Sequence, residues 1–335
     1  MKIVDLFSGL GGLTAGCIEA AKELGENIQI ALACDMNTSC VDFYKSNFKD
    51  YIVDFFSESI VNLHDELLEG IEDVDYLFAG PPCQGHSDLN NSSRRSDPRN
   101  LLYLETIRII SLLSPKVFVV ENVPAVVHAK ERVVNTLKET LGDEYCIEEY
   151  VVDFTLLGIA QTRKRHILVG RKGSLDSDVF TSIYEKFKPK VLKDVIFDLK
   201  GIESVSMFDT ASRMSPDNKK RTEYLIKHDL IDLPNNLRPK CHQGKHSYKS
   251  MYGRLDWNKP AQTITGGFGS MGQGRFLHPS EARVITPHEA ARIQGLPDWL
   301  NFNSVNKRGE LQKMIGNAVP PALSKELIIK FENEK

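Results

Sequence analysis

The feature that most constrains the fold is an alternation of short apolar runs with helical patterns over the first 170 residues. The runs are rich in Val, Ile and Phe and carry little charge, as buried parallel strands do. We expect strands at Lys2–Phe7, Ile28–Cys34, Tyr76–Ala79, Val117–Val120 and His166–Gly170. Helices are expected over Leu101–Leu113, between Pro98 and Pro115, and over Ala129–Leu141, which Gly142 ends. This order predicts an α/β fold with a doubly wound, mostly parallel sheet that binds ligands at the carboxyl ends of its strands.

The alternation stops near residue 171, and the chain becomes loop-rich up to about residue 285. A clear helix start follows, where Thr286 is the expected N-cap, Pro287 takes the first helical position and Glu289 completes a capping box. Gly295 and Pro297 are expected to end that helix. We therefore predict a first domain over 1–170, a second, smaller, loop-rich domain over 171–285, and a segment over 286–335 that returns to the first domain.

Composition excludes several classes of protein. The 335 residues are 41% hydrophobic and 26% charged, which is typical of a soluble globular protein. No apolar run approaches the length of about 18 residues that a membrane span needs, and Met1–Asp5 does not resemble a secretory leader. The six cysteines are scattered without a CxxC pair, which argues against disulfides and a Cys-rich zinc site and indicates the cytoplasm.

Charge is distributed unevenly along the chain. The net charge is −3, yet residues 171–260 hold 18 Lys and Arg against 12 Asp and Glu. Such a distribution suggests that one part of the protein binds a polyanion, although chance explains a surplus of this size about equally well.

A glycine-rich turn, Asp5–Gly12, follows the first expected strand directly. Its glycines allow the backbone to approach a nucleotide-like ligand closely, and the next helix offers free N–H groups. It is not the dinucleotide fingerprint, because the third glycine would fall at Thr14. Asp35 ends the second strand, where a carboxylate can bind both ribose hydroxyls, and Asp54 follows the next apolar run. The pattern favours a cofactor site over a purely structural turn.

The segment Gly80–Ser87 lies at the carboxyl end of the Tyr76–Ala79 strand, where active sites are found in this architecture. Two prolines restrict the backbone just before Cys83. A lone cysteine is usually a buried core residue, but polar neighbours and a special backbone favour a nucleophile here.

Two further motifs carry charged groups that could act at the same edge. Glu121 and Asn122 directly follow a strand, so Glu121 is either a solvated strand end or an acid–base group. Arg163 and Arg165 precede a strand, and alternation would place them on one face. Two guanidinium groups there could bind a phosphate or a base edge, but a solvent-exposed basic edge fits the pattern equally well. Cys241, His242 and His246 supply only three ligands in a basic loop, so we expect no metal site there.

Taken in order, these motifs resemble the cytosine carbon-5 DNA methyltransferases, which use S-adenosylmethionine as methyl donor. Pro-Cys-Gln, Glu-Asn-Val and Gly-Asn-Ala-Val-Pro are together a specific signature. The matching blocks span nearly the whole chain and are Asp5–Gly12, Asp35, Asp54, Gly80–Ser87, Glu121–Pro124, Gln161–Arg165, Thr286–Asp298 and Gly316–Pro320. The resemblance implies the S-adenosylmethionine-dependent methyltransferase fold and makes the second domain a target-recognition domain, in which Gln262–Thr265 resembles the family's small Thr-containing signature.

The resemblance also implies roles for individual residues. Cys83 would be the nucleophile, Glu121 would bind the base, and Arg163 and Arg165 would hold the cytosine and the loop that bears the thiol. The implied donor site comprises Phe7, Ser8, Gly9, Gly11, Gly12, Asp35, Met36, Asp54, Phe55, Pro81, Leu102, Asn317 and Val319. The implied DNA contacts are Gln84, Ser87, Arg238, Lys240, Gln243, Lys245, Arg254 and Thr263. Pro81, His86 and Met36 depart from common family patterns.

We expect a DNA cytosine-5 methyltransferase of the prokaryotic restriction-modification type. Its partner would be double-stranded DNA, which it would bind as a monomer, and a restriction endonuclease could be functionally paired with it. A tRNA cytosine-5 methyltransferase is the main alternative, but the Cys-Phe-Thr tripeptide of that branch is absent from the sequence. The intact set of catalytic residues argues against a silent DNA-binding protein, and the displaced third glycine argues against a nicotinamide-dependent dehydrogenase.

Overall fold

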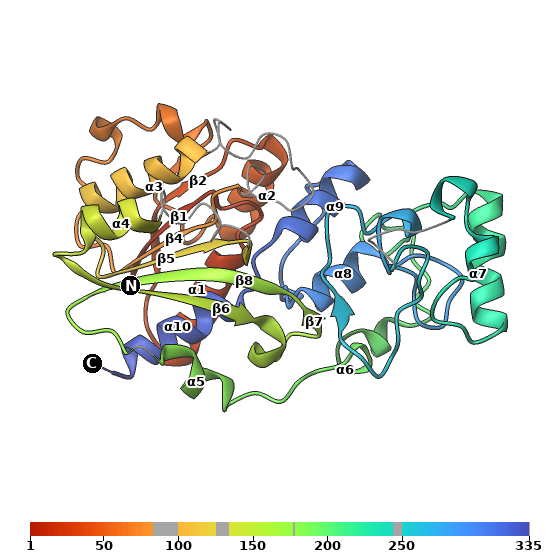
Figure 1. Ribbon diagram of the computed structural model, residues 1–335. Coiled ribbons are helices and arrows are strands. Elements are labelled where there is room, and N and C mark those ends of the chain that lie inside the picture. The colour runs from red at the N-terminus through yellow and green to blue at the C-terminus, as the bar shows by residue number, and fades with distance from the viewer. Residues whose placement is uncertain (83–99, 125–133, 177, 244–249, 335) are drawn as a thin grey trace. The chain divides into compact units, whose positions relative to one another are not determined.

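The computed structural model describes residues 1–82, 100–124, 134–176, 178–243 and 250–334 (Figure 1). The chain divides into two units. The first unit comprises Met1–Asp153, Lys164–Phe187 and Val319–Lys335, and the second comprises Phe154–Arg163 and Lys188–Ala318. These bounds differ from the expected ones, because the second unit begins at Lys188, takes in a short segment from within the expected first domain, and keeps residues 286–318.

Seven strands form one sheet in the first unit, in the order β3-β2-β1-β4-β5-β8-β6. The strands are β1 Lys2–Leu6, β2 Gln29–Cys34, β3 Phe55–Phe56, β4 Tyr76–Ala79, β5 Val117–Asn122, β6 Tyr145–Asp153 and β8 Lys164–Lys172. The five strands from β3 to β5 run parallel. The prediction of a mostly parallel α/β sheet is therefore confirmed.

The expected strand at His166–Gly170 is the middle of β8, but β8 runs antiparallel to both β5 and β6. The parallel direction expected for it was wrong. β6 was not predicted from the sequence, because Glu148 and Glu149 interrupt it and its middle residues are only partly buried. β6 and β8 follow each other closely along the chain and pair as antiparallel neighbours, so β8 runs in the direction opposite to β6.

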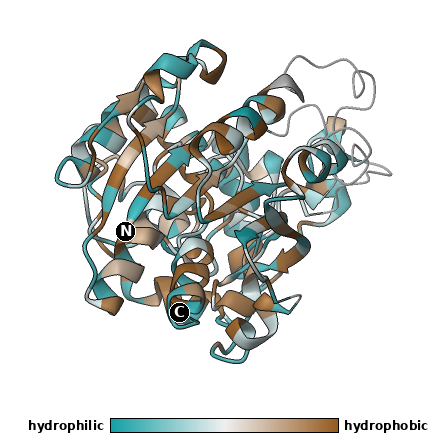
Figure 2. Ribbon diagram, turned by 90° about the vertical axis from the view of Figure 1, so that its left-hand side faces the viewer, coloured by the Kyte–Doolittle hydropathy of each residue, from teal (hydrophilic) through white to brown (hydrophobic). Residues whose placement is uncertain are grey.

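The helices of the first unit are α1 Gly12–Leu24, α2 Thr38–Phe48, α3 Asn100–Leu113, α4 Val134–Leu141, α5 Val179–Tyr184 and α10 Ala322–Glu332. The observed α3 agrees with the expected helix, whereas residues 125–133, where the next helix was expected to begin, lie outside the described part. Strand residues such as Leu77 and Val120 share one core cluster with Ile110 of α3 and Leu137 of α4. Figure 2 shows hydrophobic residues along the strands and mixed hydropathy along the helices.

The helices α1 and α10 pack closely against each other. The Ser324 hydroxyl donates to the carbonyl oxygen of Leu13 at 2.6 Å. A Cβ atom on Gly16 would collide with the backbone of Pro321 and the side chain of Ser324. The glycine therefore sets the distance between two helices that are far apart along the chain.

The second unit is loop-rich, as expected. Its regular elements are β7 Gln161–Thr162, β9 Ala261–Gln262, α6 Leu192–Ile196, α7 Pro216–Lys227, α8 Pro287–Ile293 and α9 Arg308–Asn317. The capping box of α8 is confirmed, since the Thr286 side chain accepts from the Glu289 N–H and the Glu289 carboxylate accepts from the Thr286 N–H. No helix in the described part of the chain is long and apolar enough to cross a membrane.

Candidate functional site

The topology of the first unit brings four segments to one edge of the sheet. β1, β4 and β5 are parallel neighbours, so their carboxyl ends meet at that edge. Because β8 is antiparallel, its amino end arrives at the same edge, which explains why the basic motif precedes its strand instead of following it. Active sites of open α/β sheets form at the carboxyl ends of the strands.

The glycine-rich turn contains three residues with positive φ angles. Gly9 and Gly11 adopt positive φ angles of 55° and 84°, and Phe7 also has a positive φ of 55°. A side chain at Gly11 would collide with the rings of Phe48 and Tyr44, so this position has no room for a Cβ atom. The turn is therefore compact and leads directly into α1.

Asp35 is fixed beside this turn by two backbone hydrogen bonds. Its Oδ2 accepts from the N–H of Gly9 and its Oδ1 accepts from the N–H of Asn37, both at 2.8 Å. Burial raises the pKa of this carboxyl above its usual range, and the two hydrogen bonds oppose that rise. Each carboxylate oxygen retains a lone pair, so both could accept hydroxyls from a ribose.

The turn offers further features that suit a nucleoside ligand. The Ser8 hydroxyl is buried and has no hydrogen-bond partner among the described residues. Gly12 packs directly against the backbone of Val319, because a Cβ atom there would collide with the carbonyl oxygen of Val319. Met36 exposes 68% of its surface beside Asp35, as a side chain that covers a flat ring would. These residues fit an adenosine-containing cofactor.

The other predicted donor residues have mixed surroundings. Phe55 is buried, and Leu102 is partly buried against the core. Asp54 is exposed, and its carboxylate accepts from the N–H of the next residue at 2.7 Å. The Pro81 carbonyl oxygen accepts from the Asn122 amide at 3.4 Å. Asn317 closes α9 in the second unit and is described only there.

Glu121 and Arg165 form a close ion pair at the active edge. Arg165 Nε lies 2.8 Å from Glu121 Oε1. The Arg165 side chain is 14% exposed and the Glu121 side chain is 11% exposed. The position of a Cβ atom on Gly80 would be 3.9 Å from both Glu121 Oε2 and a methyl carbon of Val319. Glu121 is therefore next to Gly80, which directly follows β4 and precedes Cys83 by three residues in the sequence. Cys83, Gln84 and Ser87 lie outside the described residues.

Alternation along one strand predicted that Arg163 and Arg165 share a face. The structure does not place them in one strand, so this prediction was wrong. β7 ends at Thr162 and β8 begins at Lys164, so Arg163 falls between two strands and belongs to the second unit. Its side chain is 3% exposed, and Nη1 donates to the carbonyl oxygens of Ile264 and Gly316, both at 3.4 Å. These contacts connect three separate segments within that unit.

Among the predicted DNA contacts, Arg254 is occupied by the protein itself. Its side chain donates to the carbonyl oxygens of Leu230 and Pro279 and forms an ion pair with Asp229. We now expect Arg254 to hold its loop instead of contacting DNA.

The remaining DNA candidates are partly engaged. The Arg238 side chain donates to the carbonyl oxygen of Leu233 at 3.2 Å. The Gln243 amide donates to the carbonyl oxygen of Arg238 at 2.6 Å, and the Thr263 hydroxyl to that of Thr162 at 3.1 Å. Lys240 is exposed, and Lys245 lies outside the described residues.

A lysine-rich face on α7 was not predicted from the sequence. Lys219, Lys220 and Lys227 lie on it together with the exposed Glu223, and none of the three lysines forms an ion pair within the described part of the chain. Their helical spacing, on the side opposite the buried Thr222 and Leu225, could have revealed this face.

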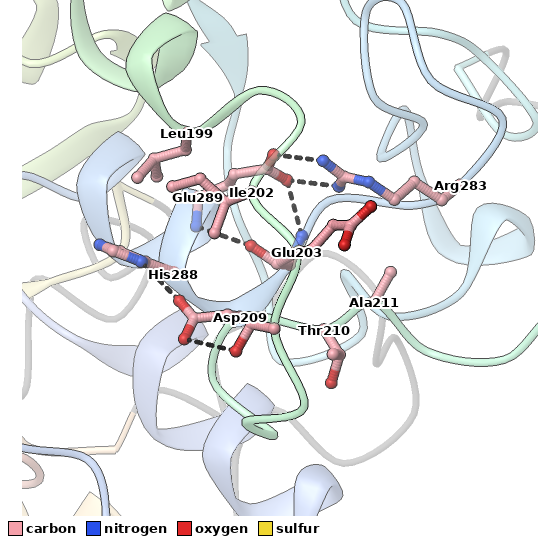
Figure 3. A pocket seen from close by; sticks show the side chains of 11 residues that line it. Leu199, Ile202, Glu203, Asp209, Thr210, Ala211, Arg283, His288 and Glu289 are labelled. Atoms are coloured by element: carbon pink, nitrogen blue, oxygen red, sulfur yellow. Dashed lines mark hydrogen bonds and ion pairs between the residues drawn. The ribbon is translucent and has the colours of Figure 1, made fainter.

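A pocket of about 300 Å³ lies in the second unit, near the start of α8 (Figure 3). Arg283 makes two hydrogen bonds of 2.7 Å to the Glu289 carboxylate, and His288 pairs with Asp209 at 2.8 Å. These charged groups satisfy one another, and none of the predicted site residues is among the described residues that line the pocket. We interpret it as a structural cavity. No group of three possible metal ligands occurs in the described ranges.

Comparison with known proteins gives consistent matches over the whole chain. The model of a family described as C-5 cytosine-specific DNA methylase matches residues 1–333. Type II methyltransferase M1.BsuMI of Bacillus subtilis is 42% identical over 97% of this chain and 78% of its own length. Type II methylase M.HgiDII of Herpetosiphon aurantiacus is 30% identical over 96% of this chain and 92% of its own. The crystal structure of a DNA modification methyltransferase encoded within a prophage of E. coli matches with a TM-score of 0.71 and 25% identity, covering 99% of both chains.

Proposed function

This chain belongs to the C-5 cytosine-specific DNA methylases, and from that premise we propose how its residues carry out the reaction. It is a DNA cytosine-5 methyltransferase, and its methyl donor is S-adenosylmethionine. It is therefore not the dehydrogenase that the glycine turn alone allowed. The observation that carries the proposal is the Glu121–Arg165 pair, which lies at the same edge of the sheet as the glycine turn and next to the segment that leads to Cys83.

Carbon 5 of cytosine is too electron-poor to accept a methyl group directly. We assign the activating step to Cys83, whose thiolate adds to carbon 6 and makes carbon 5 nucleophilic. Carbon 5 would then take the methyl group as the bond from the methyl group to the donor sulfur breaks, which leaves S-adenosylhomocysteine. The proton of carbon 5 would leave to a base that we take to be water, and the thiolate would be eliminated as the double bond between carbons 5 and 6 is restored. A thiol is mostly protonated near neutral pH, so the active site must favour the thiolate.

Glu121 would stabilise the charge that develops at N3 of the ring during the addition. Its partner Arg165 fixes one carboxylate oxygen, so the other oxygen can face the base. The Asn122 amide donates to the carbonyl oxygen of Pro81, and this bond connects the end of β5, which carries Glu121, with the segment after β4 that leads to Cys83. In this arrangement, the first unit supplies both the acid and the positioning cation.

The glycine turn and Asp35 would hold the donor. When bound, S-adenosylmethionine supplies a methyl group on a positively charged sulfur. Asp35 would accept the ribose hydroxyls, and the glycines of the turn would let the amino-acid part of the donor approach the backbone closely. Val319 would complete the same site from the carboxyl-terminal segment.

The target cytosine must leave the duplex, because carbon 6 cannot be reached inside a stack, and this flipping costs a few kcal/mol. The second unit would act as the target-recognition domain and contact the DNA with its exposed cations. We further propose that the enzyme acts as a monomer on chromosomal DNA in the cytoplasm and protects that DNA against a paired restriction endonuclease.

The test of the nucleophile uses the single substitution Cys83→Ala, with Cys146→Ala as a matched control, since Cys146 lies on β6 in a half-buried position. Plasmid DNA from cells that express each protein is analysed by bisulfite sequencing, which reports activity and target site together. We expect the Cys83 variant to lose methylation but still bind DNA, and the control to retain both.

A duplex that carries 5-fluorocytosine at the identified site should trap the natural enzyme covalently and leave Cys83→Ala untrapped. Retained turnover in Cys83→Ala, or a trapped adduct on another residue, would refute the assignment. Methylation of tRNA but not of duplex DNA in the same assay would identify the RNA-directed alternative.

A further inference from the structure

Asp5 is a buried carboxyl group directly behind the glycine turn, and the mechanism above does not use it. It lies on β1, between Ala33 of β2 and Phe78 of β4, and only 1% of it is exposed. The chain leaves the strand one residue later and enters the turn at Phe7. A carboxyl group at such a place needs a reason, because burial of a charge is costly unless it is compensated.

A chain of three buried side chains begins at Asp5. The Thr14 hydroxyl is 2.6 Å from Asp5 Oδ2 and 2.5 Å from the hydroxyl of Tyr44. Thr14 and Tyr44 are both 0% exposed. The other oxygen, Oδ1 of Asp5, finds no hydrogen-bond partner among the residues that the structure describes. The carboxyl group is therefore only partly satisfied.

These three side chains come from the three elements that adjoin the glycine turn, which are β1, α1 and α2. Asp5 precedes the turn, and Thr14 belongs to the first turn of α1 that follows it. The Tyr44 ring of α2, together with the Phe48 ring, occupies the space where a side chain on Gly11 would point. Asp35, which holds the N–H of Gly9, interacts electrostatically with Asp5. A change in the ionisation of Asp5 can therefore affect the turn through β1 before it, through α1 after it and through the Tyr44 side chain beside it.

We propose that Asp5 is a positioning residue for the donor-binding turn and that it gives up its proton when the cationic donor binds. The proposal depends on the proposed function only in that the turn is the donor site. Asp5 touches no reacting atom in it. Its ionisation state would set the hydrogen-bond direction along Thr14 and Tyr44 and, with it, the shape of the turn.

The surrounding groups support the coupling. Burial raises the pKa of Asp5 to about 7, to which the neighbouring Asp35 adds, whereas the hydrogen bonds of Thr14 and Tyr44 lower it. The titratable groups that face Asp5 from the packed elements are Cys17 of α1, Cys34 and Asp35 at the end of β2, and Tyr44 of α2, and none of them is a cation. A bound sulfonium would be the first positive charge near this cluster and would favour the carboxylate.

The sign of the pH dependence follows from linkage. If the donor favours ionised Asp5, then donor binding releases a proton below pH 7, and affinity rises with pH until Asp5 is already ionised in the free enzyme. S-adenosylhomocysteine lacks the sulfonium charge but has nearly the same shape. It should bind with a weaker dependence on pH and release less of a proton.

The experiment is calorimetric titration of the whole protein with S-adenosylmethionine at pH 6, 7 and 8, in buffers of different ionisation enthalpy, which counts the protons released. Asp5→Asn should remove the release and flatten the pH profile. Thr14→Val should move the profile to higher pH, because it removes a hydrogen bond that favours the carboxylate, and should weaken binding at pH 7 by about three- to tenfold. Thr106→Val, which removes another buried threonine hydroxyl in the first unit, is the matched control.

Each outcome decides the question. Proton release that persists in Asp5→Asn, or a Thr14→Val profile that does not move upward, would overturn the proposal, since a purely structural role moves neither. If Asp5→Asn does not fold by circular dichroism, the Thr14→Val profile alone decides. Failure of the natural protein to bind the donor at any pH would instead count against the proposed function.

Discussion

At the scale of single residues, Glu121 and Arg165 reach the same edge from strands that run in opposite directions. Glu121→Gln keeps the size of the side chain but removes its acidity and weakens the pair with Arg165. We expect single-turnover methyl transfer to slow by about 10²- to 10⁴-fold. Glu148→Gln on β6 is the control and should leave the rate unchanged. A near-normal rate in Glu121→Gln would remove its role.

Asp5 also predicts how stability changes with pH. Its pKa in the folded protein is raised from 3.8 to about 7, so its contribution to stability is fully present below pH 4 and is lost as the pH rises through 7. Asp5→Asn has no such loss, so it should gain melting temperature relative to the natural protein between pH 5 and pH 8. Thermal unfolding followed at several pH values measures this difference, and parallel curves for the two proteins would contradict it.

The sequence predicted these residues unevenly. Glu121, Asp35 and the glycine turn could be identified because each lies at or directly after the carboxyl end of a strand, and the ends of parallel strands meet at one edge. The surroundings of Arg163 and Arg254 could not be identified, because their partners are backbone carbonyls of residues far along the chain. A side chain that binds distant carbonyls has the same local sequence as one that binds DNA.

At the scale of secondary structure elements, the contact between α1 and α10 leaves no room for a side chain at Gly16. Gly16→Ala would place a methyl group against the backbone of Pro321 and the hydroxyl of Ser324. We expect a loss of about 1–3 kcal/mol in unfolding free energy, because a tight helix contact must open.

The matched control is Gly309→Ala in α9, where a Cβ atom would meet open space. That substitution should stabilise the protein by about 0.4–1 kcal/mol, through the reduced entropy of the unfolded chain. Urea denaturation of both variants measures these changes. Equal midpoints for the two variants would show that the contact tolerates a methyl group.

Strand existence was easier to predict than strand direction. The apolar runs of β1, β4 and β5 have a clear hydrophobic pattern, and so does the middle of β8. The direction of β8 depends on its pairing with the edge strand β6. β6 contains charged residues, so a search for apolar runs does not identify it as a strand. Pairing partners of this kind are decided by tertiary structure.

At the scale of the whole molecule, the charge surplus of the middle section resolves into two kinds of cation. Arginines such as Arg221 and Arg254 are bound to the protein itself, whereas the lysines of α7 form no ion pair within the described residues. The sequence showed the surplus but not this division. A helix with three such lysines is suited to phosphate contacts that carry no sequence information.

The triple substitution Lys219→Ala, Lys220→Ala and Lys227→Ala tests this division. It should weaken DNA binding about equally for all sequences and reduce the slope of log K against log salt by roughly one for each phosphate that the lysines neutralise. Lys49→Ala, an exposed lysine of the first unit, is the control. Fluorescence anisotropy over a range of salt concentrations measures the slope, and an unchanged slope would exclude α7 from the DNA interface.

The packing of α10 on α1 has a consequence for biosynthesis. α1 is complete by residue 24, but the helix that covers it begins at residue 322. At about 5–20 residues per second, the ribosome needs roughly 15–60 s to make the chain between them. Throughout that time, the small residues along this side of α1 remain exposed on the nascent chain. The earliest helix to be synthesised is thus among the last to be buried, and translation that stops before residue 322 leaves it uncovered.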